Sequence, residues 1–437
     1  MNTIITKFGG SSLADANQFK KVKNIITSDK RRKYVVPSAP GKRSSKDSKI
    51  TDLLYLCQAH VDTGISFDDV FDHIKERYIN IVKDLNLDFN IEKHLYKVKK
   101  DLENGASKDY AASRGEYLNG LVLANYLGFD FVDAKDVIIF ETDGCLNREK
   151  THIALKEKLK DHPYAVIPGF YGADENENIV TFSRGGSDVT GALVAAAVKA
   201  DLYENWTDVS GFLMADPRIV DNPKPIDSIT YSELRELSYM GASVLHEDAI
   251  FPVREIGIPI NIKNTNKPED KGTLIISDSE LCEKHETITG IAGKKDFTVI
   301  SIEKAMMNSE LGFCRKLLSV LEQNNISFEN MPSGIDTVCL VISDSQLKHK
   351  AEAVIDEIKK VCSPDSIQVH PSMAMIATVG NGMASQRGVA AKIFKALSEA
   401  DINIRMIDQG SSEMNILVGV ENDKFETAIS AIYKAFN

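Results

Sequence analysis

Several features that mark special classes of protein are scarce in this sequence. Its six cysteines include no C-x-x-C pair, and its nine histidines show neither H-x-x-x-H nor H-x-x-E-H spacing. Disulfide frameworks belong mainly to short secreted chains, and zinc sites need closely spaced ligands. We therefore expect reduced thiols and no zinc site.

Long apolar segments are also lacking. No apolar run reaches the roughly 18–20 residues that cross a bilayer, and the N-terminus shows no basic region followed by an apolar one. We therefore expect neither a membrane span nor a secretory signal, and a cytoplasmic protein without a membrane partner.

Positive charge is scarce as well. The 52 lysines and arginines are outnumbered by 63 aspartates and glutamates, which gives a formal net charge of -11. Because nucleic-acid backbones need clustered cations, we expect no nucleic-acid partner. A small anionic substrate is not excluded, provided that lysine, arginine and backbone N–H groups are placed around it.

The chain contains enough ordinary globular sequence for two or three domains, with 437 residues, 43% hydrophobic and 26% charged. An apolar start leads through a glycine turn into a helical pattern from about Leu13 to Ile26, and residues 50–127 have helical spacing. Short apolar runs then alternate with helical patterns, which predicts an α/β layer fold with a mostly parallel sheet. The polar stretch 43–49 is expected to be a mobile loop.

An internal repeat follows a polar break near residues 264–296. An offset of 76, from Ile300 to Ile376, aligns its two copies without a gap. Each copy predicts a βαββ unit whose helix starts at a glycine, and because each unit is small we expect the two to pack together. The aligned pairs are Gly312 with Gly388, Leu321 with Leu397, Ile326 with Ile402 and Leu340 with Ile416.

The first glycine cluster, Lys7-Phe8-Gly9-Gly10-Ser11-Ser12, follows the first expected strand. Adjacent glycines let backbone N–H groups approach a phosphate, and the following helix adds a positive dipole end. Lys7 could then offset the negative charge of a phosphoryl group in transfer. The spacing is not that of a P-loop. Taken alone, such a cluster is more often a tight turn beside an exposed lysine.

Two further clusters combine glycine with charge. In Ser183-Arg184-Gly185-Gly186-Ser187-Asp188, the arginine can grip a carboxylate with two hydrogen bonds, and the aspartate can cap the next helix or orient Lys7. Thr207 and Asp208 are placed to line a nucleotide site, although a surface loop has the same composition.

A fourth cluster, Ser113-Arg114-Gly115-Glu116, lies in a helical pattern. Glu116 could bind a substrate ammonium group, although a solvated ion pair with Arg114 is the commoner explanation for such a tetrad.

In this order, the clusters resemble the aspartokinase family of amino-acid kinases, and the repeat resembles a pair of ACT domains, which sense amino acids. The resemblance covers nearly the whole chain. It implies a three-layer amino-acid-kinase domain with a mostly parallel central sheet over 1–280, and two ACT domains of the α+β, βαββαβ type over 290–365 and 366–437. The matched stretches are 7–12, 113–116, 182–188, 207–211, 215–218, 239–242 and 262–265, with Gly272-Thr273.

The resemblance also implies a role for each matched residue. Lys7 would stabilise the transferring phosphoryl group, and Asp188 would position Lys7. The residues implied in aspartate binding are Ser38, Thr51, Glu116, Arg184 and Ser187. Those implied at the ATP are Gly9, Gly10, Ser11, Thr207, Asp208, Arg218, Asn266 and Lys267. Those implied in holding an amino-acid effector are Met307, Ser309, Gly312, Phe313, Ser327 and Glu329.

The implied activity is ATP-dependent phosphorylation of the side-chain carboxylate of L-aspartate, giving 4-phospho-L-aspartate and ADP, as the first step of lysine, threonine and methionine biosynthesis. That carboxylate is ionised at neutral pH, since its reference pKa is about 3.9, and no general base is needed. Mg²⁺ should bridge the ATP oxygens and be held mostly by phosphate and water, without protein ligands.

The tail implies feedback regulation. Glu329 would pair with the side-chain ammonium of L-lysine, and the ACT domains would join chains into a homodimer or a dimer of dimers. The alternative is that Glu329 is solvated and the tail serves only in dimerisation.

Other interpretations of the whole chain are weaker. A kinase acting on glutamate or N-acetylglutamate would share the fold, but the Ser-Arg-Gly-Glu tetrad and the paired tail argue against it. A catalytically silent amino-acid sensor would be expected to lack Lys7 or Arg184, and both are present. Because the chain ends at Asn437, we expect no additional nicotinamide-dependent dehydrogenase domain.

Overall fold

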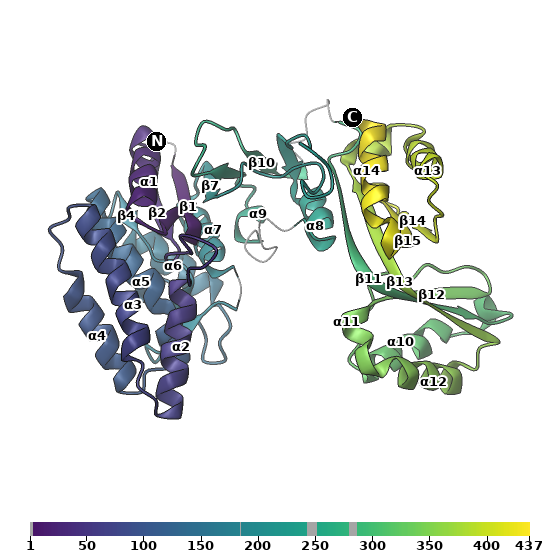
Figure 1. The fold of residues 1–437 in the computed structure, drawn as a ribbon, viewed down its shortest axis with the longest axis horizontal. Helices are drawn as coiled ribbons and strands as arrows, with labels where there is room; N and C mark the ends of the chain where they lie inside the picture. Colours follow the sequence, from purple (N-terminus) through teal and green to yellow (C-terminus); the bar gives the residue numbers. More distant parts are fainter. Residues whose placement is uncertain (1–2, 184, 243–250, 279–285) are drawn as a thin grey trace. The chain divides into compact units, whose positions relative to one another are not determined.

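The computed structural model describes residues 3–183, 185–242, 251–278 and 286–437 (Figure 1). The chain divides into two compact units. The first unit contains 1–212, 225–235 and 243–282, and the second contains 213–224, 236–242 and 283–437. Two short segments of the middle region therefore cluster with the C-terminal part. The domain boundaries drawn from the sequence stay a prediction.

The first unit is built around a sheet that has eight strands within the described residues, in the order β3-β4-β2-β1-β7-β9-β10-β8. Its pairings are parallel except that of β9 with β10. β1 is buried over its whole length, as expected for a central parallel strand covered on both faces. The strands are β1 (Ile4–Phe8), β2 (Arg32–Pro37), β3 (Asp130–Phe131), β4 (Ala165–Val166), β7 (Leu202–Thr207), β8 (Ser228–Thr230), β9 (Ile260–Asn264) and β10 (Thr273–Ile276).

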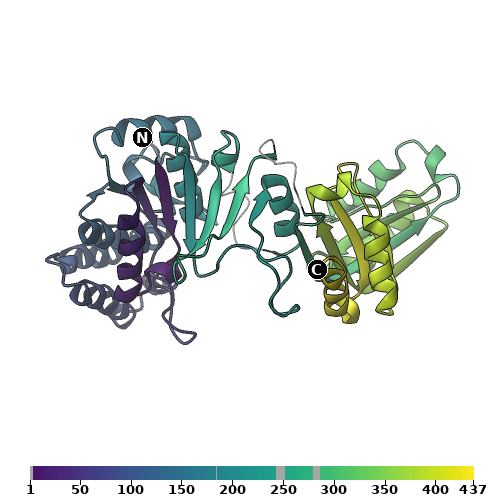
Figure 2. The same ribbon diagram turned by 90° about the horizontal axis from the view of Figure 1, so that it is seen from above.

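Helices cover both faces of this sheet (Figure 2). Five of them, α1 to α5, share one core with Phe8, Val35 and Trp206, while α7 packs against β1, β2 and β7 from the other side and α6 packs beside α7. The predicted three-layer α/β architecture is confirmed. The helices are α1 (Ala16–Ser28), α2 (Ile50–Thr63), α3 (Asp68–Asp84), α4 (Ile91–Glu103), α5 (Lys108–Leu127), α6 (Arg148–Lys158), α7 (Gly186–Val198), α8 (Tyr231–Tyr239) and α9 (Phe251–Arg254). A small ribbon adds β5 (Tyr171–Ala173) and β6 (Ile179–Thr181).

The predicted helix start at Leu13 was wrong. The glycine cluster continues into a 3-10 turn, η1 (Gly10–Leu13), and α1 begins only at Ala16. The reason is a cap: the Asp15 side chain accepts the N–H of Gln18 at 3.0 Å, which fixes the first turn of α1 there.

The second unit contains an antiparallel sheet in the order β12-β11-β13-β15-β14. The second copy of the repeat has the predicted order of strand, helix and two strands. In the first copy, one strand follows the first helix, and isolated bridges at Asn330 and Ser333 stand in place of the other predicted strand. Each copy also adds a helix at its end that the βαββ prediction lacked. The strands are β11 (Gly290–Glu303), β12 (Thr337–Ser343), β13 (Ser366–Val379), β14 (Met406–Asp408) and β15 (Asn415–Glu421). The helices are α10 (Phe313–Gln323), α11 (Asp344–Leu347), α12 (Ala351–Cys362), α13 (Val389–Glu399) and α14 (Phe425–Phe436).

Glycines begin the first helix of each copy, as predicted. Gly312 and Gly388 precede α10 and α13 with φ of 78° and 84°, a left-handed conformation that glycine adopts without steric cost. The two long strands join the copies: 297–303 of β11 pairs with β12, whereas 290–294 pairs with 375–379 of β13. One continuous sheet therefore runs through both copies.

The ungapped alignment of the two copies was wrong at their last strands. Ile300 pairs with Leu340, whereas the equivalent Ile376 pairs with Val418. Leu340 therefore corresponds to Val418 and not to Ile416, because the second copy has two extra residues in the turn before β15.

The alignment holds up to that turn. The N–H of Glu329 donates to the carbonyl of Val341 at 2.8 Å, and the N–H of Arg405 donates to that of Gly419 at 2.8 Å. Glu329 and Arg405 thus occupy equivalent positions in the two copies.

Candidate active site

Neighbouring parallel strands end together at one edge of the first unit's sheet, and each end carries a predicted functional segment. The register pairs Phe8 with Pro37 of β2 and with Trp206 of β7. Ligand sites of open α/β sheets lie outside the carboxyl ends of the strands. The residues that directly follow β1, β2, β7 and β9 are Gly9, Ser38, Asp208 and Thr265.

Lys7 lies at this edge between two polar partners. Its Nζ is 2.6 Å from Oδ1 of Asp188, and the two side chains are only 10% and 17% exposed. Nδ2 of Asn205 donates to the same oxygen at 2.7 Å, and Lys7 Nζ donates to Asn205 Oδ1 at 3.5 Å. The Asp188 side chain makes no cap for α7, and its carboxylate pairs with Lys7 instead. Sequence reasoning missed Asn205, which the pairing of β1 with β7 places directly beside Lys7.

The turn after β1 leaves no room for a side chain at Gly10, whereas Gly9 has ordinary contact distances around it. The N–H of Gly9 donates to the carbonyl of Trp206 at 3.0 Å, and a Cβ on Gly9 would lie 3.8 Å from Lys7 Nζ. A Cβ on Gly10 would lie 2.8 Å from the carbonyl oxygen of Ala39. The 3-10 turn η1 begins at Gly10, whereas α1 begins only at Ala16. The backbone N–H groups nearest to the two glycines therefore belong to η1 and not to the first turn of α1.

The turn is also tied to β9. Ser12 Oγ and Thr265 Oγ1 are 2.7 Å apart, and both side chains are buried. This hydrogen bond fixes the glycine turn relative to the segment that carries Asn266 and Lys267.

Glu116 and Ser38 lie on opposite sides of one contact between α5 and the turn after β2. A Cβ on Gly115 would lie 2.7 Å from Cβ of Ala39, so α5 packs closely on this turn. Burial raises the pKa of the Glu116 carboxyl to about 8, and a hydrogen bond from the backbone of Ala39 acts in the opposite direction. Asn119 Nδ2 donates to the Ser38 carbonyl at 2.6 Å. Thr51, in the first turn of α2, follows Ile50, which also approaches Gly115.

Two buried acceptors in this region are unpaired within the described residues. They are Oε2 of Glu116 and Oδ1 of Asn119, three residues apart on α5. Leaving such atoms without a hydrogen-bond donor costs about 1–3 kcal/mol each. Each of these oxygens can accept a hydrogen bond from a donor such as an ammonium group.

The second glycine turn leads into α7. Gly185 has φ of 56°, Gly186 begins the helix, and Ser187 is 8% exposed. A Cβ on Gly169 would lie 2.6 Å from Ser187 Oγ, so a second backbone segment approaches this turn. That segment continues into Phe170, a non-glycine residue with φ of 79° that sequence reasoning missed. Arg184, predicted to bind the α-carboxylate, lies outside the described residues.

Arg114 does not form the solvated ion pair considered from the sequence. It is buried, its Nε and Nη2 donate to Ser113 Oγ at 3.1 and 2.8 Å, and its guanidinium faces three aromatic rings. The rings are those of Tyr110, Tyr117 and Tyr171. Because this enclosure satisfies the cation, Glu116 is left for another partner.

The other predicted nucleotide residues of the first unit lie at the end of β7 or just after β7 and β9. Thr207 Oγ1 donates to Asp208 Oδ1 at 3.2 Å. Asn266 Oδ1 accepts from Lys21 Nζ at 2.7 Å, and the N–H of Lys267 donates to a carbonyl of the same turn at 3.2 Å. Arg218 belongs to the second unit, where it pairs with Asp216 at 2.6 Å. Its ATP-binding role stays a prediction.

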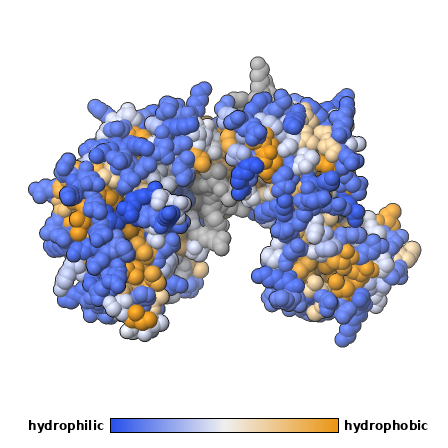
Figure 3. All heavy atoms as spheres, in the orientation of Figure 1, coloured by the Kyte–Doolittle hydropathy of each residue, from blue (hydrophilic) through white to orange (hydrophobic). Residues whose placement is uncertain are grey.

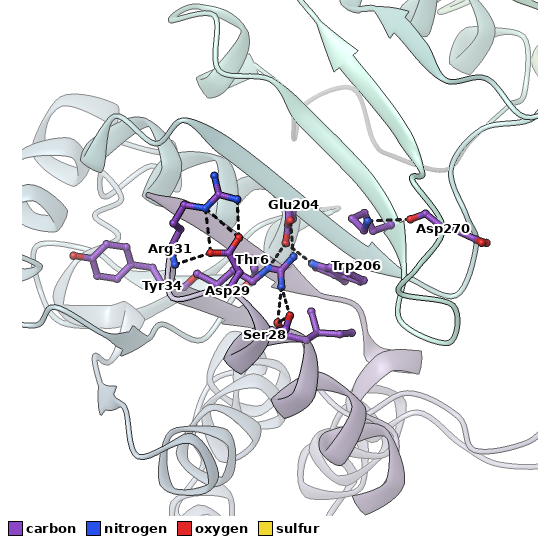
Figure 4. Close-up of polar contacts among 11 residues, drawn as sticks. Thr6, Ser28, Asp29, Arg31, Tyr34, Glu204, Trp206 and Asp270 are labelled. Carbon is purple, nitrogen blue, oxygen red and sulfur yellow. Dashed lines mark hydrogen bonds and ion pairs between the residues drawn. The ribbon is translucent and has the colours of Figure 1, made fainter. Parts of the chain in front are cut away.

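A buried polar network around β7 lies next to the sheet edge that carries the candidate site (Figure 4). Glu204 on β7 accepts from Arg32 Nε at 2.8 Å and from Trp206 Nε1 at 2.9 Å. The Trp206 ring also stacks on Phe8, and Lys263 Nζ lies 5.3 Å from its centre. Trp206 is thereby fixed, and with it the carbonyl that holds Gly9.

The predicted effector residues lie in the first copy of the repeat. Met307 and Phe313 are buried in its core, whereas Ser309 and Ser327 are exposed. Glu329 hydrogen-bonds Tyr239, the last residue of α8, and burial together with this carboxylate raises the pKa of that tyrosine to about 12. Glu329 is therefore engaged by a polar group, and is not simply solvated.

The described part of the chain holds no cluster of three or more His, Cys, Asp or Glu residues spaced to bind a metal ion. Within that part, no helix is both long and apolar enough to cross a membrane.

Comparison with known proteins gives two family matches. The model of the amino acid kinase family matches residues 2–264, and an ACT domain model matches residues 376–436. The first unit thus has the architecture of an amino acid kinase, with an ACT domain following it in the chain.

Individual relatives narrow this class. Aspartokinase 3 of Bacillus subtilis is 38% identical over 99% of this chain and 98% of its own length. The crystal structure of Clostridium acetobutylicum aspartate kinase is 64% identical over 100% of both chains, with a TM-score of 0.93. The chain belongs to the aspartokinase family and is an aspartate kinase, which confirms the resemblance seen in the sequence.

A more distant structure is informative through its ligands. Escherichia coli aspartokinase III in complex with aspartate and ADP is 25% identical over 99% of each chain, with a TM-score of 0.74. The same enzyme in complex with lysine and aspartate, described as its T-state, gives a TM-score of 0.75.

Proposed function

We propose that this enzyme transfers the γ-phosphoryl group of ATP to the side-chain carboxylate of L-aspartate, giving 4-phospho-L-aspartate and ADP. The observation that carries the proposal is the Lys7–Asp188 pair, with 2.6 Å between Nζ and Oδ1, at the end of β1 beside the first glycine turn. The E. coli relative with aspartate and ADP, similar over 99% of each chain, supports the same pair of ligands here.

The chemistry is mainly positioning of charge. The aspartate side chain is ionised at neutral pH and attacks the γ-phosphorus directly, so the enzyme has to align two anions and offset their repulsion. Lys7 supplies the positive charge that stabilises the transferring phosphoryl group. Asp188 and Asn205 act through Lys7: they hold its ammonium at the edge of the sheet and prevent it from swinging into solvent.

Aspartate binding uses the turn after β2, the start of α2 and the start of α7. Glu116 faces the substrate ammonium, which pairs its unpartnered oxygen and restores its charge. Ser38, Thr51 and Ser187 supply hydroxyl groups around the substrate, and Arg184 binds its α-carboxylate.

ATP lies along the ends of β1, β7 and β9. N–H groups of Gly9, Gly10 and Ser11 bind its phosphates, and Thr207, Asp208, Asn266 and Lys267 line the remainder of the nucleotide. Mg²⁺ would be held by phosphate oxygens and water. The ion would screen the charge of the phosphates when bound.

L-lysine is the proposed effector, which places the enzyme in the pathway to lysine, threonine and methionine. The lysine-bound E. coli relative supports this choice. Glu329 offers a carboxylate to the lysine side chain, with Met307, Ser309, Gly312, Phe313 and Ser327 around it. The equivalent position of the second copy is Arg405, which would repel an ammonium group. We therefore propose one lysine per chain, in the first copy, shifting an equilibrium between two states.

The assembly is proposed to be a homodimer or a dimer of dimers formed through the ACT copies, in the cytoplasm. An open depression of about 610 Å³ on the first copy is lined by α10 and the residues after it. Apolar side chains gather over the α10 and α12 region of this copy (Figure 3), including Leu318 and Phe328. Exposed apolar patches of this kind mark interfaces between chains.

A hydroxamate assay tests the catalytic proposal, because hydroxylamine traps the acyl phosphate. Aspartate should give ATP-dependent product, whereas glutamate and N-acetylglutamate should not. Lys7→Ala should lower kcat by about 100-fold or more while the circular-dichroism spectrum is unchanged. Lys20→Ala, an exposed lysine on α1, is the control and should keep full activity. Near-normal turnover of Lys7→Ala, or product from glutamate in place of aspartate, would contradict the assignment.

A further inference from the structure

A buried arginine grips the loop between β2 and α2 at two points. Arg77 on α3 has a side chain that is 5% exposed, and its Nη2 donates to Oδ1 and Oδ2 of Asp47 at 2.8 and 2.7 Å. Its Nη1 donates to the carbonyl of Gly41 at 3.1 Å. The polar stretch 43–49 has no regular secondary structure, as expected, but it is anchored to a neighbouring helix.

The gripped loop touches the first glycine turn directly. The N–H of Gly41 donates to the carbonyl of Gly10 at 2.8 Å. A Cβ on Gly41 would lie 2.7 Å from the carbonyl carbon of Gly10 and 2.8 Å from the nitrogen of Ser11. Two backbone segments can approach this closely only where both residues are glycines.

The same loop begins and ends at the aspartate subsite. Ser38 precedes it and Thr51 follows it, and the N–H of Ile50 donates to the carbonyl of Pro40 at 3.3 Å, which closes the loop at its base. The glycine turn has other supports, namely the backbone of β7 and the Ser12–Thr265 hydrogen bond. By contrast, the hydrogen bonds that tie the segment from Ser38 to Thr51 to α3 come from the Arg77 guanidinium.

The ion pair is built to stay charged. A hydrogen bond from Arg43 and the charge of Arg77 hold the pKa of the Asp47 carboxyl well below its usual range. Burial lowers the pKa of Arg77, but arginine remains protonated in proteins. Nη2 donates to both Asp47 oxygens while Nη1 donates to the Gly41 carbonyl, so the planar guanidinium holds two points of the loop at once, which the single ammonium of a lysine could not do in the same geometry.

We propose that Arg77 and Asp47 are positioning residues that hold the 39–49 loop against Gly10 and so fix the aspartate subsite. They act on substrate affinity and do not touch the reacting atoms. The proposal rests on the proposed function, because it assigns Ser38 and Thr51 to aspartate. Neither Arg77 nor Asp47 was identified from the sequence.

Steady-state kinetics of Asp47→Asn and Arg77→Lys test the proposal. Each change keeps the size of the side chain but removes the paired geometry. We expect the KM for aspartate to rise about tenfold, which is the effect of losing one charge-assisted hydrogen bond, with kcat and the KM for ATP changed less than twofold. The double variant Asp47→Asn with Arg77→Lys should have a KM for aspartate close to that of either single variant, because both substitutions disrupt the same ion pair.

Arg43→Gln is the matched control. Arg43 also pairs with Asp47, at 2.9 Å, but it is 48% exposed, and the Gly41 carbonyl accepts its bond from Arg77. It should leave all three constants unchanged. Asp47→Glu should restore part of the aspartate affinity that Asp47→Asn loses.

Two outcomes overturn the proposal. One is a lower thermal midpoint with an unchanged KM for aspartate, which would show a purely structural pair. The other is an equal rise in the KM for aspartate and the KM for ATP, which would show that the variants disturb the whole active site and not the aspartate subsite alone. Nucleotide binding can be followed separately by the fluorescence of Trp206, the single tryptophan of the chain. If the wild-type enzyme gave no product from aspartate, the proposed function would fail first, independently of these variants.

Discussion

The pH dependence of aspartate binding follows from the burial of Glu116. Its side chain is 5% exposed, burial raises its pKa to about 8, and one carboxyl oxygen has no partner among the described residues. At pH 7 the free enzyme therefore holds a mostly neutral carboxyl. The substrate ammonium binds the ionised form, so binding has to release a proton.

The magnitude follows from the distance between the pH and this pKa. Each unit below the pKa lowers the ionised fraction about tenfold. The KM for aspartate should fall about tenfold from pH 6 to pH 7, and the curve should flatten near pH 8. Glu116→Gln cannot ionise, so its KM should be raised by about 10-fold to 100-fold and should not vary with pH over this range.

The same group affects the stability of the ligand-free protein. The pKa of Glu116 in the folded state lies above its ordinary value of 4.5, so the stability that its protonated form contributes is fully present below pH 4.5 and is lost as the pH rises toward 8. Thermal unfolding should therefore show Glu116→Gln gaining stability relative to wild type across this window, on the order of 1 kcal/mol per pH unit. A wild-type KM that is flat between pH 6 and pH 8, or a Glu116→Gln enzyme with normal KM, would refute the reasoning.

Three further predictions concern other parts of the molecule. Asp188→Asn should lower kcat by about 100-fold with little change in the KM for aspartate, because Lys7 loses its anchor; an unchanged kcat in single-turnover phosphorylation would contradict this. Gly10→Ala should destabilise the protein by about 1–3 kcal/mol in thermal unfolding and raise the KM for ATP, because its Cβ would lie 2.8 Å from the Ala39 carbonyl oxygen; normal values of both would count against the glycine contact. Glu329→Gln should abolish inhibition by L-lysine and keep activity without it, whereas Arg405→Ala should remain lysine-sensitive; calorimetry should then find one lysine site per wild-type chain.

Local sequence determined the parts of the site that depend on backbone conformation. A glycine pair directly after a strand predicted a close approach to the backbone, and Gly10 lies where a side chain would collide with the Ala39 carbonyl. Short apolar runs between helical patterns predicted the parallel sheet, and Gly312 and Gly388 predicted where α10 and α13 begin. Each of these signals acts within a few residues of the chain.

Several site residues carry no such local signal. Asn205 and Arg77 are ordinary residues within a strand and a helix, and they matter because the sheet register and the packing of α3 bring them to Lys7 and Gly41. The helix start was predicted too early because the apolar pattern begins at Leu13, whereas the Asp15 cap begins α1 at Ala16. The two-residue shift between the ACT copies became visible only in the pairing of β15.

The sequence by itself determined the fold class, the family and the positions of both glycine turns, because backbone conformation and hydrophobic periodicity are properties of short segments. The tertiary structure decided which charges meet. Lys7 and Asp188 are far apart in the chain, yet their side chains are 2.6 Å apart. The burial that raises the pKa of Glu116 arises from the packing of α5 on the turn after β2. Burial and electrostatic pairing depend on distant segments, and only the folded chain fixes them.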